Sequence, residues 1–233
     1  MPISGTRHLS IGGGVARAIK FQPDANCVLW TPGQDDPQSA VIRDRSGQGN
    51  DGAITGCLWV RTSKGTWVQN FDGDDEVNVA NDASLMMGTQ DFTYKMWVNF
   101  VSYANAHQFL LAHRSTADWF TFDVLNTGKL SLEYTGGAHF EHPTVITTNV
   151  WHHAIATRRG GFAYLYLDAV EHDPTLDLSA VNALNATILR IGGTSWGWSC
   201  ICRIGLTVYD VGRGWTATEV AGNYNQERHL FGV

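Results

Sequence analysis

The sequence predicts an all-β protein in which two antiparallel sheets pack as a β-sandwich. Three observations support this fold class: helical periodicity is nearly absent, short stretches rich in Val, Ile, Thr and aromatic residues recur, and Gly, Asp and Asn turns separate them. Turns such as 72–73, 126–128 and 159–161 are typical of hairpin connections. Because so many short strands alternate with turns, a sandwich is favoured over a parallel α/β sheet.

The expected strands follow one another along the chain, with no linker or internal repeat between them. They cover residues 27–31, 53–60, 66–70, 76–80, 92–101, 108–113, 119–124, 129–134, 144–148, 151–158, 163–167, 186–191 and 201–209. One short C-terminal helix is expected near 216–225, because Thr216 and Glu219 have the spacing of a capping box. We expect one domain over residues 22–233, preceded by an N-terminal arm over residues 1–21.

Composition excludes several classes of protein. Hydrophobic residues make up 43% of the chain, which excludes intrinsic disorder. The net charge of −6 argues against a nucleic-acid partner, since such proteins present a basic face. No apolar run approaches the roughly 18 residues of a membrane helix, so no membrane insertion is expected. Basic residues are mostly Arg, which favours a partly covered surface, although codon bias explains the same excess.

The ends and the cysteines bear on the compartment. The N-terminus lacks the charged, apolar and small-residue regions of a secretory signal, so we expect a protein made in a cytoplasm unless a signal has been removed. Cys27, Cys57, Cys200 and Cys202 are too few for a disulfide scaffold and are expected to be buried thiols. Cys200 and Cys202 share one face of a strand, so we expect no bond between them, whereas a Cys27–Cys57 bridge is left open.

Four segments in order are similar to the concanavalin A-like lectin/glucanase superfamily, in particular to its laminin G-like jelly-roll branch. The similarity spans about residues 26–228 and implies a jelly-roll β-sandwich. The segments are D-R-S-G-Q-G-N-D-G at 44–52; F-D-G-D-D-E-V at 71–77 with D-F-T-Y-K-M-W-V at 91–98; W-H-H-A at 151–154 with L-Y-L-D-A-V at 165–170; and L-R-I-G-G at 189–193 with L-T-V-Y at 206–209.

The catalytic residues of the superfamily's glucanases are absent from this sequence. Glucanases of this superfamily place their carboxylates on one strand as E-x-D-x-x-E, and this spacing is absent here. The nearest acidic group, Asp168 and Glu171, occupies the family's hairpin, where Asp168 is expected to form a turn. We therefore expect no catalytic residues and no enzyme activity.

Two histidine pairs invite a metal or general-base reading. His152 and His153 face opposite sides of a strand, and the resemblance implies that one ring is buried and hydrogen-bonded. His139 and His142 flank an acidic residue, but their spacing is not diagnostic for zinc, so a solvated loop is expected there.

The resemblance also implies a candidate structural Ca²⁺ site, because relatives often bind this ion in the corresponding turns. The oxygens would come from Asp44, Asn50, Asp72, Asp74 and Asp75. The acidic residue of the strand before the last helix is missing, since Ile204 or Gly205 stands in its place, and Arg203 is available to neutralise the acidic turn. Bound Ca²⁺ is left open, and no other cofactor is expected.

Sugar recognition requires aromatic rings beside planar polar groups. The best candidates are Trp196 and Trp198 in one loop, with Trp119, Tyr103 and His107 as further carbohydrate-binding candidates. The alternative is that these rings cap the edge of the sandwich or lie in a subunit contact.

The N-terminal arm contains Gly12-Gly13-Gly14, which is costly to order. Ile11, Val15, Ile19 and Phe21 would compensate by burial, so we expect them to form an assembly arm that docks on a neighbouring copy. Docking on its own sandwich is the alternative.

Two classes of function follow. The first is a non-catalytic structural or adhesion protein of a virus particle, in particular of a phage, such as a capsid decoration or tail-associated protein. Its partners would be copies of itself, other virion proteins and a surface glycan. The second is a secreted or cell-surface carbohydrate-binding module with an extracellular location. A glycoside hydrolase is the distant alternative.

Overall fold

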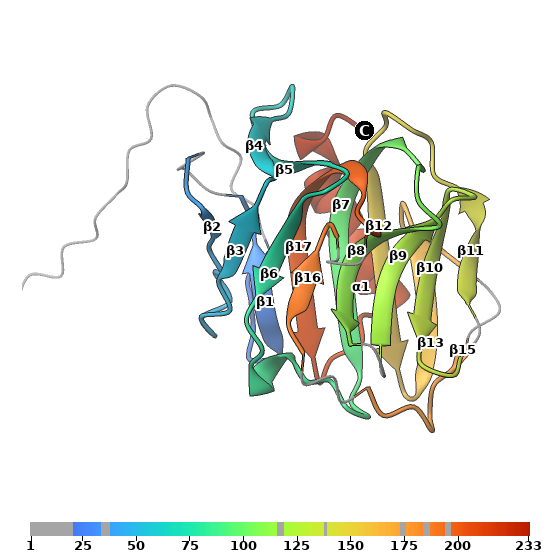
Figure 1. Ribbon diagram of the computed structural model, residues 1–233. Helices are drawn as coiled ribbons and strands as arrows, with labels where there is room; N and C mark the ends of the chain where they lie inside the picture. Colours follow the sequence, from blue (N-terminus) through green and yellow to red (C-terminus); the bar gives the residue numbers. More distant parts are fainter. Residues whose placement is uncertain are drawn as a thin grey trace, which may run out of the picture.

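The computed structural model describes residues 21–33, 38–115, 119–137, 139–172, 176–183, 187–193 and 197–233. Two antiparallel sheets lie face to face, as the sequence predicts, and the C-terminal helix covers the sheet that lies behind in the view of Figure 1. No described helix is long and apolar enough to cross a membrane.

The first sheet has nine strands in the order β14-β13-β12-β7-β17-β5-β4, with β1 paired to β17 and β15 paired to β13. Its strands are β1 (Cys27–Thr31), β4 (Leu58–Arg61), β5 (Trp67–Asp72), β7 (Phe92–Ser102), β12 (His152–Arg159), β13 (Phe162–Leu167), β14 (Val170–Glu171), β15 (Leu176–Asp177) and β17 (Ile201–Val211).

The second sheet has eight strands in the order β11-β10-β9-β8-β16-β6-β3-β2. They are β2 (Val41–Ile42), β3 (Gly52–Thr55), β6 (Glu76–Val79), β8 (His107–Arg114), β9 (Trp119–Leu125), β10 (Lys129–Tyr134), β11 (Phe140–Val145) and β16 (Leu189–Ile191). The short helices are η1 (Ala83–Leu85), α1 (Ala217–Glu227) and η2 (Arg228–Leu230).

Two predicted strands match the structure to the residue, namely β1 and β10, and two others are wrong in an informative way. The stretch 53–60 is divided, because β3 joins the eight-stranded sheet and β4 joins the nine-stranded sheet. Gly56 makes this crossing at φ +83°, where an added Cβ would lie 1.9 Å from Asp75 Oδ1. The stretch 144–148 is mostly loop, since the strand there is β11, which begins at Phe140 and pairs Phe140 with Leu132.

The expectation that Cys200 and Cys202 stay unbonded is wrong. The two residues form a disulfide, with Cα atoms 5.5 Å apart. The β17–β7 register shifts between Ile201 and Cys202, and the Cα separation lies within the range that a disulfide spans. Cys27 and Cys57 are buried free thiols, as expected, and no bridge joins them.

Helix α1 starts with the predicted capping box, in which the Thr216 hydroxyl accepts from the Glu219 amide and the Glu219 carboxylate accepts from the Thr216 amide. The other end of the helix is held by a buried ion pair between Lys95 and Glu227. Trp97 Nε1 donates to Glu227 at 2.7 Å, and Lys95 Nζ also donates to the Leu206 carbonyl at 2.9 Å. These bonds fix α1 to the outer face of the nine-stranded sheet.

The assembly-arm residues Ile11, Val15 and Ile19 lie outside the described residues. Phe21 is described, and its ring packs against Trp30 and Trp215 at centroid distances of 5.4 and 6.0 Å. The last residue of the arm is therefore attached to its own sandwich, on the same face as α1.

Replacing Glu227 by Gln should lower the free energy of unfolding by about 3–5 kcal/mol, because it leaves the buried Lys95 ammonium without its counter-charge. The matched control is Glu141→Gln in the ion pair with Lys129, whose side chains are 36% and 35% exposed; it should cost at most about 1 kcal/mol. Urea unfolding followed by tryptophan fluorescence measures both. Equal midpoints for the two variants would contradict the role assigned to the buried pair.

Acid should destabilise the fold through a buried imidazole. His113 is 1% exposed, and burial lowers its pKa to about 4. The unfolded chain therefore binds this proton below about pH 6.5, whereas the folded chain does not. The contribution of neutral His113 to the free energy of unfolding is fully present above that pH and is lost as pH falls toward 4, by about 3 kcal/mol in total. His113→Leu should reduce the slope of the unfolding free energy against pH between 6.5 and 4.5, with a remainder from His153, whose pKa burial also lowers. An unchanged slope would show that His113 does not contribute.

Candidate functional site

The outer face of the eight-stranded sheet is polar in its middle. On β9, Phe120, Phe122 and Val124 belong to the core between the sheets. Successive side chains of a strand point to opposite faces, so Thr121 and Asp123 lie on the outer face. The same alternation on β10 buries Leu130 and Leu132 in the core and places Ser131 and Glu133 outside. The hairpin thus presents a row of oxygen atoms away from the core.

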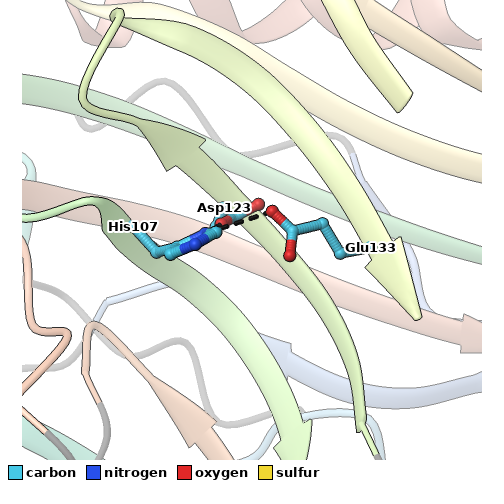
Figure 2. A group of neighbouring side chains, drawn as sticks. All are labelled: His107, Asp123 and Glu133. Atoms are coloured by element: carbon cyan, nitrogen blue, oxygen red, sulfur yellow. Dashed lines mark hydrogen bonds and ion pairs between the residues drawn. The ribbon is translucent and has the colours of Figure 1, made fainter. Parts of the chain in front are cut away.

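One imidazole points toward the two carboxylates of this row, as Figure 2 shows. His107, the first residue of β8, places Nδ1 2.7 Å from Asp123 Oδ2 and 3.1 Å from Glu133 Oε1. His139, which precedes β11, places its Nδ1 2.7 Å from the same Glu133 oxygen. We call His107, Asp123, Glu133 and His139 the carboxylate cluster.

Burial and ion pairing shift the titration of this cluster. Hydrogen bonds to Asp123 and then to Glu133 raise the pKa of His107 to about 10, so the ring is cationic at neutral pH. Burial raises the pKa of Asp123 to about 7. Burial also acts to raise the pKa of Glu133, but the hydrogen bond and charge of His107 together with His139 outweigh it, and the net pKa is lowered.

Several buried oxygens of this face have no hydrogen-bond partner among the described residues. They are Thr121 Oγ1, Asp123 Oδ1 and Ser131 Oγ, and each of the three residues is 0% exposed. Ser131 stands directly opposite Asp123 in the β9–β10 ladder, so their side chains share one face. Buried polar groups in folded proteins normally find partners, so these oxygens point to a ligand, an ion or bound water.

Aromatic rings adjoin the carboxylate cluster on the same face. The Trp198 ring lies 5.3 Å from His107 and 5.6 Å from Phe109, measured between centroids. The Arg114 guanidinium carbon lies 4.4 Å from the Trp198 ring centroid and 4.9 Å from that of Trp119. We call Trp198, Arg114 and Trp119 the aromatic platform; both indoles are half-buried.

A cleft of about 290 Å³ opens beside the platform. Trp119 lines it together with Phe120, Tyr134, Thr135 and residues 180–183. It lies where the ends of β9 and β10 meet the segment that follows β15, and it combines aromatic rings with hydroxyl and amide groups. Its volume is at the small end of the range for ligand pockets.

The structure brings together three of the five predicted carbohydrate-binding residues. His107 contacts Trp198, and Arg114 joins Trp198 to Trp119. Tyr103 lies apart from them, since its ring packs on Phe100 at 5.4 Å and its hydroxyl donates to the Ile146 carbonyl. Trp196 lies outside the described residues.

Sequence reasoning missed Asp123, Glu133 and Arg114. A signal for the first two was present, because 119–124 and 129–134 are predicted strands joined by a predicted hairpin turn. Strict alternation in these strands places Asp123 and Glu133 on the polar face of the hairpin. The contacts of Arg114 with the two indoles depend on the path of a loop, and no local pattern marks it.

The predicted calcium ligands separate into two groups. Asp44 accepts from the amides of Trp30, Ser46 and Asn50 and from the Ser46 hydroxyl, so its oxygens serve the turn itself. Asn50 donates to the Val28 carbonyl and to Ser84 Oγ. Because their side chains make these hydrogen bonds, Asp44 and Asn50 stabilise the loop itself.

The other three carboxylates fit calcium better. Asp72, Asp74 and Asp75 each have an oxygen within 4.8 Å of the others, and they would be the protein ligands of a Ca²⁺ ion. The guanidinium of Arg203, which the sequence makes available to neutralise the acidic turn, donates a hydrogen bond to Asn70 Oδ1 at 3.3 Å.

The predicted histidine pairs have different outcomes. His153 is buried and hydrogen-bonds Asn223 at 2.9 Å, and His152 pairs with Asp168 at 2.7 Å on the opposite side, as expected. Asp168 lies in a turn at φ 52°. The solvated loop expected for His139 and His142 is wrong for His142, because pairing of β11 with β10 carries it into a buried position where it is 2% exposed.

Comparison with known proteins places the chain in a family. The sequence profile described as the concanavalin A-like lectin/glucanases superfamily matches residues 71–201, more than half of the chain, and confirms the resemblance. No curated protein matches the sequence.

Three solved structures share the fold at low sequence identity. The binding domain of Paraclostridial Mosquitocidal Protein 1 has a TM-score of 0.70 at 15% identity, over 86% of this chain and 52% of that one. Trypanosoma rangeli sialidase with the inhibitor DANA has a TM-score of 0.70 at 12% identity, over 91% of this chain and 34% of that one. Domain 4 of AbnA, a GH43 extracellular arabinanase from Geobacillus stearothermophilus solved with arabinotriose, has a TM-score of 0.67 at 12% identity, over 85% and 98%. The chain thus spans about half of the first protein and a third of the second.

Proposed function

The chain belongs to the concanavalin A-like lectin/glucanases superfamily, and we propose that it is a non-catalytic carbohydrate-binding domain whose ligand lies on the aromatic platform. The observation that carries this proposal is the placement of the Arg114 guanidinium near two half-buried indoles on one face of a sheet. The apolar faces of sugar rings pack on indoles, while their hydroxyls bond to planar charged groups at the edge.

The surroundings of the platform support this ligand class. The adjoining cleft adds the Tyr134 ring, the Thr135 hydroxyl and the Asn182 amide beside Trp119, so a sugar chain could run from Trp198 into it. Among proteins with the same fold, the arabinanase domain was solved with a bound arabinotriose. The present chain shares the fold of this arabinanase domain but little of its sequence.

The absence of catalysis is part of the proposal. Glycoside hydrolysis needs two carboxyl groups on either side of the scissile bond. Asp123 is 0% exposed, and both Asp123 and Glu133 are ion-paired to His107, so a sugar cannot easily come between them. The hairpin acids are also engaged, since Asp168 accepts from the His153 amide at 2.8 Å and Glu171 accepts from the Tyr166 hydroxyl.

Trp198→Ala and Trp119→Ala should each weaken glycan binding by about thirtyfold, which corresponds to about 2 kcal/mol for the loss of a central Trp contact. A glycan array identifies the ligand, and isothermal titration calorimetry measures the affinity. The ligand should be recovered uncut after long incubation with the wild-type protein.

The matched control is Trp67→Ala, since Trp67 is also half-buried beside an arginine, with Arg61 5.2 Å from its ring centroid, but belongs to the nine-stranded sheet. It should bind as the wild type does. Equal losses for Trp67→Ala and the platform variants, or cleavage of the glycan, would contradict the proposal.

We further propose that the domain acts as a structural or adhesion component of a virus particle, joined to copies of itself through residues 1–21; the alternative location is extracellular. The contacts of Phe21 with Trp30 and Trp215 lie within its own chain, so what supports an assembly role is the open pocket of about 280 Å³ beside them, with Arg213, Glu219 and Gln226 among its walls. The last residue of the arm therefore lies in an apolar contact beside a groove.

Deletion of residues 1–20 should convert an oligomer into a monomer in multi-angle light scattering, with little change of the melting temperature. Phe21→Ser in the full chain tests the same contact with a single side chain. A truncated protein that assembles as before and only melts earlier would show that the arm serves its own fold.

A further inference from the structure

The carboxylate cluster has the donor atoms of a metal centre. It brings two imidazoles and two carboxylates together from β8, β9, β10 and the residue before β11. We infer that His107, Asp123 and Glu133 bind one divalent transition-metal ion through Nδ1 of the histidine and one oxygen of each carboxylate, three donors that all lie within 4.8 Å of one another. His139, whose Nδ1 contacts Glu133, would support that carboxylate from outside the ligand set. This inference does not depend on glycan binding.

The spacing of the donors fits such an ion after a small displacement. Nδ1 of His107 lies 2.7 Å from the Asp123 oxygen and 3.1 Å from the Glu133 oxygen, and Nδ1 of His139 lies 2.7 Å from the latter. Around a tetrahedral zinc ion with bonds of about 2.0–2.2 Å, ligand atoms stand roughly 3.4 Å apart. The His107 nitrogen therefore needs to move roughly 0.3–0.7 Å away from the two carboxylate oxygens to admit the ion, and a water molecule would complete the tetrahedron.

Burial and unmet polar groups point to a ligand independently of this spacing. Asp123 is 0% exposed, yet its Oδ1 has no partner among the described residues, and Ser131 Oγ opposite it has none either. The protonated His107 ring supplies one positive charge beside the two carboxylates, and a divalent ion would displace that proton and supply two. A water bound to the ion could reach Asp123 Oδ1 and the Ser131 hydroxyl.

The donor types select the class of ion. Imidazole nitrogen together with carboxylate oxygen suits zinc and its first-row neighbours, whereas calcium takes oxygen donors alone. The acidic turn of Asp72, Asp74 and Asp75 offers only oxygens and would compete for calcium but not for zinc. The His152–Asp168 pair has the same 2.7 Å contact but belongs to no group of three donors among the described residues.

The test uses the full chain, stripped with a chelator and titrated with Zn²⁺ by calorimetry, and with Co²⁺ by visible absorption. We expect one Zn²⁺ per chain and a Co²⁺ spectrum of tetrahedral type. Glu133→Gln and His139→Asn should weaken Zn²⁺ binding by at least about tenfold, since even residues that only support metal ligands cost 10–100-fold. His139 is half-exposed, so its variant keeps the inference testable if Glu133→Gln fails to fold.

His152→Asn is the matched control and should bind Zn²⁺ as the wild type does. Asp75→Asn tests the acidic turn and should change only the response to Ca²⁺. The inference is overturned if the wild-type chain binds no Zn²⁺, if both site variants bind it as tightly as the wild type, or if Asp75→Asn or His152→Asn removes the binding. Because no glycan is present, a negative result here leaves the glycan-binding measurements to decide the proposed function separately.

Discussion

The buried ion pair of Lys95 and Glu227 determines which faces of the sandwich remain available. It ties the last turn of α1 to β7, and the helix side then buries Trp97, whose ring stacks on Tyr224 and Phe231 at 5.8 and 4.4 Å. Taking two charges out of water is costly, so such a pair contributes more to a defined position than to net stability. With the nine-stranded sheet covered by α1 in this way, the carboxylate cluster and the aromatic platform lie on the outer face of the other sheet.

That outer face holds the two candidate binding sites, the aromatic platform and the carboxylate cluster, within a short distance of each other. His107 contacts both the aromatic platform, through Trp198, and the carboxylates of β9 and β10. The platform is partly open, whereas Asp123 is sealed. An ion in the cluster would hold the His107 ring in place, and the ring in turn supports one side of Trp198. In the proposed function, the buried charges would thus position the ring that supports the glycan-binding surface.

The sequence predicts the fold well because its signals are local or repeated. Alternation of polar and apolar residues predicts both ends of β10 correctly, and the capping box at Thr216 predicts the start of α1. The division of 53–60 between sheets was not predictable, because β3 and β4 look alike locally and only the approach of Gly56 to Asp75 separates them. The site was predictable in part. Rings such as Trp198 and His107 stand out by type, whereas Asp123 and Glu133 lie ten residues apart and meet only through the register of β9 and β10.

The β-bulge in β17, between Gly205 and Val208, limits which residues can stand at position 206. Pairing with β7 shifts register between Gly205 and Val208, and Leu206 adopts φ 48° while its carbonyl accepts from Lys95. Glycine would relieve the backbone there, but it would remove a side chain that is 1% exposed and packs with Val68, Trp97 and Phe231. Valine and isoleucine are excluded by their branched Cβ at positive φ. Natural or laboratory evolution is thereby confined at position 206 to apolar residues that are not branched at Cβ, such as the leucine present there.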